Sequence, residues 1–273
     1  MAGVAEHFSR LVEEFADAIA CPECNGQLSL TNSQSAVCEQ CKESYRWIGQ
    51  TWELVPSRCR ESSPLWATWD QLQANGLVSY REDPEHNLAI SERPDNLDFS
   101  DFCSFDGRVL DVGCGPQSWP TYFRTHTTHT RFVGVDPLIE TSSGQYLQLR
   151  ALAEHLPFRS GVFDHVVFAT SLDHFVDPVR ALREAGRTCR ADGEIDVWIG
   201  EKRAGAPPPT ESPEWYRRLE RPVGSEDLFH IKRLDMEDLT GFVGEAGLRA
   251  LDYEVRRVDE YRTNHFFRLK SRA

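Results

Sequence analysis

Short apolar runs separated by polar stretches dominate the second half of the chain, and they have the length of strands. The runs at residues 108–112 and 131–135 contain no polar alternation, which is typical of parallel strands buried on both faces. After the first run, a helix is expected to open near Ser118, with Pro120 in its first turn. Other elements are predicted as strands at 146–150, 165–170, 194–199, 248–258 and 264–270, the last two forming a terminal hairpin, and as a helix at 235–247.

Glycine and aspartate stand where the first two predicted strands end. Gly113 and Gly115 follow the first strand and allow a sharp turn close to a ligand, and Asp136 ends the second strand. A carboxylate in that place can accept hydrogen bonds from both hydroxyls of a ribose. The alternative is an ordinary strand-to-helix turn with a solvated aspartate. The succession of strand, turn, helix, strand and aspartate favours a nucleoside-type cofactor site.

Five segments carry a family resemblance through their order along the chain: DVGCG at 111–115, GVD at 134–136, AEHLPF at 153–158, FDHVVFATS at 163–171 and LREAGRTCRADG at 182–193. Over about residues 105–200 the chain resembles the class I S-adenosylmethionine-dependent methyltransferases. The resemblance implies an α/β fold with a Rossmann-like, seven-stranded, mostly parallel sheet, and S-adenosylmethionine as cofactor. It also implies cofactor contacts: Asp111, Gly113 and Gly115 for the methionine end, Asp136 for the ribose, Ala153 and Glu154 for the adenine edge, and Thr170 after the fourth strand.

Two residues depart from the family pattern. Gln117 stands where the family usually has a third glycine, and Leu152 stands where it usually has an acidic residue. A side chain at position 117 would crowd or re-route the loop around the methionine end. Leu152 removes one partner of the adenine amine. Neither departure removes the first two glycines or the ribose carboxylate.

Four cysteines form two CxxC pairs, Cys21 with Cys24 and Cys38 with Cys41, separated by thirteen residues. This spacing is typical of a zinc ribbon, in which four thiolates fill a tetrahedral site and the metal is structural. Disulfides are the alternative, and they fit poorly with a chain that has no secretory signal. A hairpin at residues 45–55, with Gly49 at its turn, is expected to close the ribbon.

The patterns divide the chain into three parts. Residues 1–60 are expected to hold an N-terminal helix and the small zinc-ribbon module, residues 61–104 a connector or lid, and residues 105–273 the methyltransferase domain. The connector either covers the cofactor and substrate cleft or merely packs its aromatics on the sheet. The N-terminal helix is predicted from an apolar stripe at helical spacing, formed by Val4, Phe8, Leu11, Val12, Phe15 and Ile19.

Composition and charge limit the expected cellular location and the expected class of binding partner. The 273 residues contain no apolar run near the roughly 20 residues of a membrane helix, so a cytoplasmic protein without membrane contact is expected. The net charge of −13 disfavours nucleic acid as a partner and leaves a small-molecule substrate as the first choice. Residues 1–60 carry 5 basic and 8 acidic residues, so the ribbon lacks the basic composition of an RNA-binding module. The oligomeric state is not determined.

Candidate acid–base residues follow the fourth predicted strand. His174 has the intrinsic pKa range of a general base, and Asp173 could assist it or bind substrate. Alternatively, the pair caps a helix. His230, between the fifth strand and the next helix, is a second candidate. Nearby residues could line the acceptor pocket, namely Trp215, Tyr216, Arg217, Arg218 and Arg221, with the arginines pairing with a carboxylate or phosphate. Alternatively, the three arginines form a solvated helix face.

Three functions are compatible with these patterns. The first is methylation of a small molecule, such as a hydroxyl of a sugar or natural product. The second is ribosomal RNA methylation, because a four-cysteine ribbon before this type of domain resembles the guanine N1 methyltransferases of large-subunit rRNA. The third is a degenerate cofactor fold that acts as a protein-interaction module, which Gln117 and Leu152 motivate.

Overall fold

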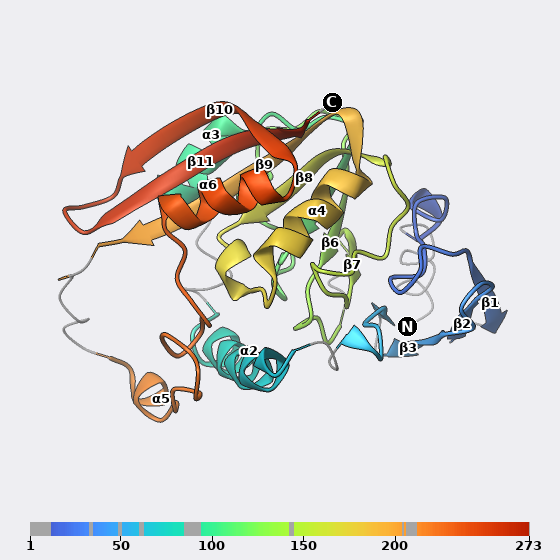
Figure 1. Ribbon diagram of the computed structural model, residues 1–273, viewed down its shortest axis with the longest axis horizontal. Coiled ribbons are helices and arrows are strands. Elements are labelled where there is room, and N and C mark those ends of the chain that lie inside the picture. The colour runs from blue at the N-terminus through green and yellow to red at the C-terminus, as the bar shows by residue number, and fades with distance from the viewer. Residues whose placement is uncertain are drawn as a thin grey trace.

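A seven-stranded sheet forms the centre of the molecule, with strand order β10-β11-β9-β8-β5-β6-β7 (Figure 1). The computed structural model describes residues 12–32, 35–48, 51–59, 63–84, 94–141, 145–203, 205 and 212–272. The sheet strands are β5 (Arg108–Val112), β6 (Arg131–Val135), β7 (Leu147–Leu149), β8 (Phe163–Ala169), β9 (Cys189–Lys202), β10 (Leu248–Arg257) and β11 (Arg262–Ser271). Strands β5 to β9 pair in parallel, whereas β11 runs antiparallel to both β9 and β10. The predicted mostly parallel sheet and its terminal hairpin are confirmed.

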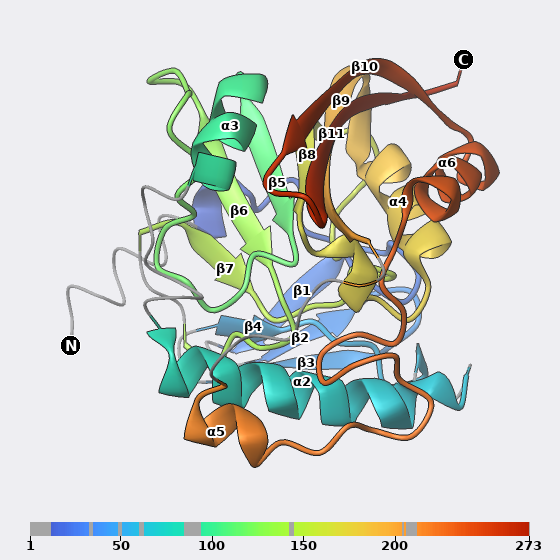
Figure 2. The same ribbon diagram turned by 90° about the vertical axis from the view of Figure 1, so that its left-hand side faces the viewer.

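Helices cover both faces of the sheet, as its buried strands require. Helices α4 (Pro178–Thr188) and α6 (Met236–Glu245) lie on one face and α3 (Pro94–Phe102) on the other (Figure 2). The side chain of Asp177 caps α4 by accepting a hydrogen bond from the Arg180 amide, and Pro178 occupies the first turn. Helix α6 confirms the helix predicted at 235–247 and begins with a reciprocal capping box between Asp235 and Asp238.

The prediction of a helix after β5 is wrong. Residues 117–125 form turns instead of a helix. Threonine supplies five of the ten residues at 121–130, and its β-branched side chain is a poor helix former. Aromatic packing holds the segment in place, with the rings of Phe123 and Phe132 stacked at 4.1 Å between centroids.

The N-terminal module is a four-stranded antiparallel sheet made of β1 (Leu28–Asn32), β2 (Ser35–Cys38), β3 (Ser44–Ile48) and β4 (Thr51–Glu53). The hairpin predicted at 45–55 is confirmed as β3 and β4, and its turn at Gly49 lies outside the described residues. Trp47 and Trp52 pack edge to face across the hairpin. Two aromatic rings thus supply part of the small core of this module.

The module is joined to the large sheet at its β7 edge. The amide of Leu54 donates to the carbonyl of Arg150, whose own amide donates to the carbonyl of Trp52, at 2.8 and 3.0 Å. Phe15 is fully buried against Phe163. Within the predicted N-terminal stripe, Val12, Phe15 and Ile19 pack on the common core, whereas Val4, Phe8 and Leu11 lie outside the described residues. The two sheets therefore share one core.

Helix α2 (Leu65–Glu82) lies across the carboxyl ends of the parallel strands (Figure 2). Its Trp66 and Trp69 are buried, and Asn75 holds the chain after β9 by donating to the carbonyls of Glu220 and Leu228. The short helix α5 (Glu214–Arg217) packs beside it. Among the residues that the structure describes, no helix is both long and apolar enough to span a membrane.

Candidate active site

A cavity of about 340 Å³ opens beneath α2 at the carboxyl ends of the parallel strands. This is where ligands bind in open α/β sheets. Most of the predicted cofactor and acid–base residues line it, namely Gly113, Asp136, Ala153, Glu154, Thr170, His174 and His230, together with Trp69, Gln73 and Tyr80 of α2. The predicted residues Asp111, Gly115 and Asp173 lie directly behind this lining, in contact with Tyr122, Asp136 and His230. One cavity thus joins both predicted sets.

The two glycines of the loop after β5 have different neighbours. Gly113 has a φ of +78°, and a Cβ there would lie 2.4 Å from the Cβ of Ser171. Ser171 itself is fixed by a 2.6 Å hydrogen bond from its hydroxyl to the carbonyl of Val112. Gly115 has a φ of +66°, and a Cβ there would lie 2.9 Å from the hydroxyl of Tyr80 on α2. Both positions exclude a side chain for reasons of backbone conformation and packing.

Asp136 lies at the end of β6 with both carboxylate oxygens anchored. Oδ2 accepts from the amide of Gly115 at 2.9 Å and Oδ1 from the amide of Leu138 at 2.7 Å. Burial raises the pKa of this carboxyl to about 6, although the two amides act in the opposite direction. Each oxygen keeps a second lone pair, so the carboxylate can still accept hydrogen bonds from a ribose.

Asp111 is completely buried at the end of β5. Its Oδ2 accepts a 2.7 Å hydrogen bond from the Tyr122 hydroxyl, whereas Oδ1 has no partner among the described residues. Burial raises the pKa of Asp111 to about 7, with a further increase from the charge of Asp136 and an opposing effect of Tyr122. An incompletely paired buried carboxylate fits the cationic methionine end of S-adenosylmethionine.

The loop after β7 contains the predicted adenine contacts. Ala153 and Glu154 line the cavity, and Oε1 of Glu154 accepts from the amides of Val176 and Asp177 at 2.8 and 3.2 Å. Burial raises the pKa of Glu154. This carboxylate thus also fixes the chain that leads into α4.

The two residues that depart from the family pattern have structural partners of their own. Leu152 is buried in a cluster with Trp66 and Trp69, so it attaches α2 to the loop after β7. The Gln117 side chain donates to the carbonyl of Cys114 at 2.8 Å, and the Gln117 carbonyl accepts from Gln148 at 2.9 Å. Gln117 therefore closes the glycine loop with a side-chain hydrogen bond.

Thr170 occupies a strained position at the end of β8. It has a φ of +54°, which is uncommon for a β-branched residue, and its amide donates to the carbonyl of Trp198 at 2.9 Å. Both residues line the cavity. Strain of this kind is often found at ligand sites, because the surrounding fold must enforce it.

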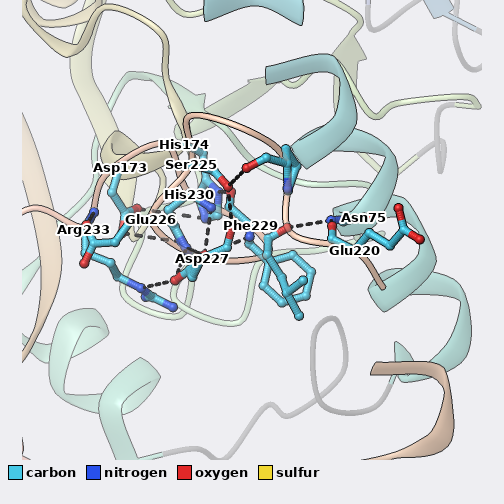
Figure 3. A network of polar contacts seen from close by, with 12 residues as sticks. Asn75, Asp173, His174, Glu220, Ser225, Glu226, Asp227, Phe229, His230 and Arg233 are labelled. Carbon is cyan, nitrogen blue, oxygen red and sulfur yellow. Dashed lines mark hydrogen bonds and ion pairs between the residues drawn. The ribbon is translucent and has the colours of Figure 1, made fainter. Parts of the chain in front are cut away.

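Opposite the donor residues, the imidazole rings of His174 and His230 lie 4.2 Å apart between centroids, beside the carboxylate of Asp173 (Figure 3). Nε2 of His230 is 3.5 Å from Asp173 Oδ2, and Nε2 of His174 is 3.9 Å from Asp173 Oδ1. Burial, followed by the charge of His230, lowers the pKa of His174 to about 4. Asp173 and His174 belong to the short 3-10 helix η3 (Leu172–His174), and Asp177 caps α4 in their place.

Sequence reasoning missed Asp227. Its carboxylate accepts from Nδ1 of His230 at 2.8 Å and from Nε of Arg233 at 2.8 Å. Burial acts to raise the pKa of Asp227, but the hydrogen bond and charge of His230 outweigh it and hold the pKa well below its usual range. The three-residue spacing of Asp227 and His230 was the available signal, because it allows the two side chains to meet within one turn.

The arginines in and after α5 face solvent and do not line the pocket, which is the second of the two expectations. Arg217, Arg218 and Arg221 are exposed and do not line the cavity, and Arg218 lies 3.9 Å from Glu214 as a solvated pair. Trp215 and Tyr216 are half-buried and pack on each other, also outside the cavity lining.

The four cysteines of the ribbon converge. Their sulfurs all lie within 4.8 Å of one another, with 3.6 Å between Cys21 and Cys41 and 3.4 Å between Cys24 and Cys38. A tetrahedral Zn²⁺ with four sulfurs at about 2.3 Å separates the sulfurs by about 3.8 Å. All four thiols are free of disulfides. The spacing and donor chemistry therefore fit zinc.

The backbone around the cysteines repeats in both pairs. Asn25 and Lys42, which follow Cys24 and Cys41, both have positive φ, at 58° and 64°. The amide of Asn25 donates to the Cys21 carbonyl and that of Lys42 to the Cys38 carbonyl. Two matching tight turns thus present the sulfurs to a single point.

Comparison with known proteins finds a family match within the central part of the chain. Residues 110–196 match the family described as a methyltransferase domain. None of the curated proteins matches the chain. The matched range holds the end of β5, all of β6, β7, β8, η3 and α4, and the first part of β9, together with the predicted donor residues after β5 to β8. It supports S-adenosylmethionine-dependent methyl transfer and says nothing of the ribbon.

Solved structures share the fold at low sequence identity. A Burkholderia thailandensis 1,6-didemethyltoxoflavin-N1-methyltransferase, crystallised with 1,6-didemethyltoxoflavin and S-adenosylhomocysteine, is 13% identical with a TM-score of 0.54, and the match covers 90% of this chain and 99% of that one. A Haemonchus contortus phosphoethanolamine N-methyltransferase 2 is 12% identical with a TM-score of 0.51, covering 77% and 59%. The [4+2]-cyclase SpnF is 15% identical with a TM-score of 0.51, covering 82% and 97%. A cyclase among these shows that the fold alone does not determine the reaction.

Proposed function

We propose that the protein transfers the methyl group of S-adenosylmethionine to a hydroxyl of a small molecule, such as a sugar or natural product. The observation that carries the proposal is the shared cavity, which has the predicted nucleoside contacts on one side and two imidazoles, next to the Asp173 carboxylate, on the other. The family match over residues 110–196 supports the donor. The net charge of −13 supports a small acceptor over RNA.

At the donor side, residues from three strand ends would hold the cofactor. Asp136 would bind the ribose hydroxyls, and Asp111 would face the methionine end with the turns at Gly113 and Gly115. The loop after β7 would bind the adenine edge through Ala153 and Glu154, and Thr170 would lie at the boundary with the acceptor. The bound cofactor supplies an electrophilic sulfonium methyl, so the protein has mainly to orient the acceptor.

At the acceptor side, the protein has to place a hydroxyl in line with the methyl group and remove its proton. His174 and His230 line the cavity, and Asp173 contacts both rings. We assign proton removal to this cluster, with His174 as the general base, Asp173 as its assistant and His230 as the neighbouring second base. Tyr80 and Trp69 of α2 cover the same space, which excludes water from the transfer.

In the ribbon, Cys21, Cys24, Cys38 and Cys41 are proposed to bind one structural Zn²⁺. The converging sulfurs and the two matching turns support this assignment. Four protein ligands fill the coordination sphere, so the metal would stabilise the fold and would take no part in methyl transfer.

The test is incubation of the purified protein and methyl-labelled S-adenosylmethionine with a metabolite extract and, separately, with unmodified ribosomal RNA. We expect label in a small molecule from the extract and none in RNA. Label only in RNA would overturn the small-molecule acceptor and favour the ribosomal RNA alternative. Absence of cofactor binding in calorimetry would contradict both enzymatic functions and favour the protein-interaction module. Asp136→Ala serves as the matched variant, since it should lose transfer to any acceptor.

A further inference from the structure

The polar cluster at the acceptor side brings three metal-binding atoms together. One ligand atom from each of Asp173, His174 and His230 lies within 4.8 Å of the others. The Nε2 atoms of His230 and His174 lie 3.5 and 3.9 Å from the two carboxylate oxygens of Asp173. Ligands at about 2.1 Å from one divalent ion are about 3.0 Å apart at a right angle and about 3.4 Å apart at the tetrahedral angle. To reach this spacing around one ion, the ligand atoms would have to move closer by up to about 1.4 Å.

The outer nitrogens of both rings are already engaged. Nδ1 of His230 lies 2.8 Å from Oδ1 of Asp227, and Nδ1 of His174 lies 3.2 Å from the carbonyl oxygen of Phe229 (Figure 3). Carboxylates and carbonyls only accept hydrogen bonds, so Nδ1 of each ring is the donor in these contacts. The Nε2 atoms are left as the two ring atoms that can bind a metal, which displaces any proton on them. These two Nε2 atoms face the Asp173 carboxylate, and no hydrogen bond from another described residue reaches Asp173.

Asp227 is itself held firmly. It accepts from the amides of Phe229 and His230 at 2.8 and 2.9 Å and from Arg233 Nε at 2.8 Å. A carboxylate or carbonyl partner on the outer nitrogen is the usual support of a metal-binding histidine, since it sets the tautomer and the ring orientation. Both histidines of the cluster have such a partner. This second layer is an observation independent of the cluster distances.

From these contacts we infer that His174, His230 and Asp173 bind one divalent transition-metal ion through the two Nε2 atoms and a carboxylate oxygen. Two histidines and one carboxylate leave coordination positions open, as in non-haem metal enzymes. Because both histidines line the cavity, the open positions face the place of the acceptor. An oxygen of the acceptor bound there would have a lowered pKa. This activation of the acceptor rests on the proposed methyl transfer, whereas metal binding itself does not. If the metal is bound, activation by the metal would take the place of proton removal by a free imidazole.

The test is titration of Co²⁺ into protein whose ribbon already holds zinc, followed by absorption in the visible range. Cobalt with nitrogen and oxygen ligands gives ligand-field bands without the strong thiolate charge-transfer band of a cysteine site. Elemental analysis after gel filtration gives the stoichiometry. We expect two metal ions per chain in the wild type, and one in His230→Gln and in Asp173→Asn. His129→Gln, an exposed histidine far from the cluster in sequence, should keep both.

The outcomes separate metal binding from methyl transfer. A single metal ion per chain in the wild type, or a cobalt spectrum that both variants leave unchanged, would overturn the metal site. In that case the cluster is a proton-sharing histidine–aspartate group. Asp173→Asn changes little of the packing, so it tests the site even where His230→Gln fails to fold. Calorimetry with S-adenosylmethionine on the same samples tests the donor separately. Cobalt binding without cofactor binding would refute only the methyl transfer. Cofactor binding without cobalt binding would refute only the metal site.

Discussion

The cysteine cluster of the ribbon and the histidine–aspartate cluster of the cavity differ in how their metal-binding atoms are surrounded. Each cluster brings its ligand atoms within 4.8 Å. The N-terminal module supplies four sulfurs from two matching turns, enough to fill the tetrahedral site of the proposed zinc ion. The cavity supplies three nitrogen and oxygen atoms, and two of the residues face open space. A site closed by the protein stabilises the fold, whereas a site left open can bind a ligand. The contrast predicts that mutations in the two clusters separate stability from activity.

The largest effect is expected from Cys38→Ser. Cys38 is fully buried, and losing one thiolate should release the metal and lower the unfolding free energy by more than about 3 kcal/mol. Thermal unfolding and zinc analysis measure the change. Cys59→Ser is the matched control, because Cys59 is also buried but lies outside the cluster, and its sulfur donates to the Pro56 carbonyl. If the two variants were equally stable, the cysteine cluster would have no special role in stability, and the two clusters would not differ in the way proposed.

His174→Gln should have the opposite profile. The His174 side chain is about 38% exposed, so its loss should change the unfolding free energy by no more than about 1 kcal/mol. Methyl transfer should fall by roughly 100-fold, the usual loss when a proton-removing group is deleted. Activity with the acceptor found in the extract and thermal unfolding are the two measurements. A variant that loses stability and keeps activity would reverse the assignment.

Asp136→Ala extends the comparison to the donor side of the cavity. The dissociation constant of S-adenosylmethionine should rise more than tenfold, because a buried, charge-assisted contact to the ribose is lost. Calorimetry gives the constant. Asp136 also anchors the amides of Gly115 and Leu138, so Asp136→Asn, which keeps one acceptor oxygen, should weaken binding less. An unchanged constant in the alanine variant would refute the ribose contact.

The smallest effect is a dependence of cofactor binding on pH. The pKa values of Asp111 and Asp136 are raised to about 7 and about 6, so both carboxyls are largely protonated at about pH 5.5 and ionised at about pH 8. The cationic cofactor prefers the ionised forms, so its affinity should increase several-fold over that range. Stability of the free protein should change in the opposite sense. The unfolded carboxyls ionise first, so the contribution of these groups falls as pH rises from about 4 to about 7.

Calorimetry at the two pH values measures the cofactor effect, and Asp111→Asn is its control. The variant should show a weaker dependence, because one of the two titrating groups is gone. A dissociation constant that is equal at both pH values in the wild type would show that neither carboxyl titrates on binding. The carboxyl pair would then be no part of the cationic donor site.

The sequence predicted the sheet, and it predicted residues that the structure brings around one cavity, because these signals are local. Short, mostly apolar runs followed by glycine or aspartate predicted β5 and β6, and the cysteine spacing predicted the convergence of four sulfurs. The contacts that complete the site are not local. Asp227 supports His230 across one turn, but Trp69 donates to the carbonyl of His174 from 105 residues away. Such long-range contacts leave no periodicity in a single sequence.

The helix expected near Ser118 failed for a related reason. The glycine loop predicts the helix that usually follows it, whereas the threonines of residues 121–130 and the packing of Phe123 determine turns. In the sequence alone, Gln117 and Leu152 suggest a loss of cofactor contacts. In the structure, Gln117 closes the loop and Leu152 attaches α2.

The contact between Gly113 and Ser171 changes what a glycine in this loop can reveal about relatives. A Cβ at position 113 collides with Ser171 whether or not a ligand is present. The glycine is therefore a requirement of folding, and a descendant that had lost the methyl donor would still be selected to keep it. A relative with alanine at this place should carry a compensating change at position 171. In an alignment, the retention of a carboxylate at position 136 would report on cofactor use, whereas the glycine would report only on the packing of two loops.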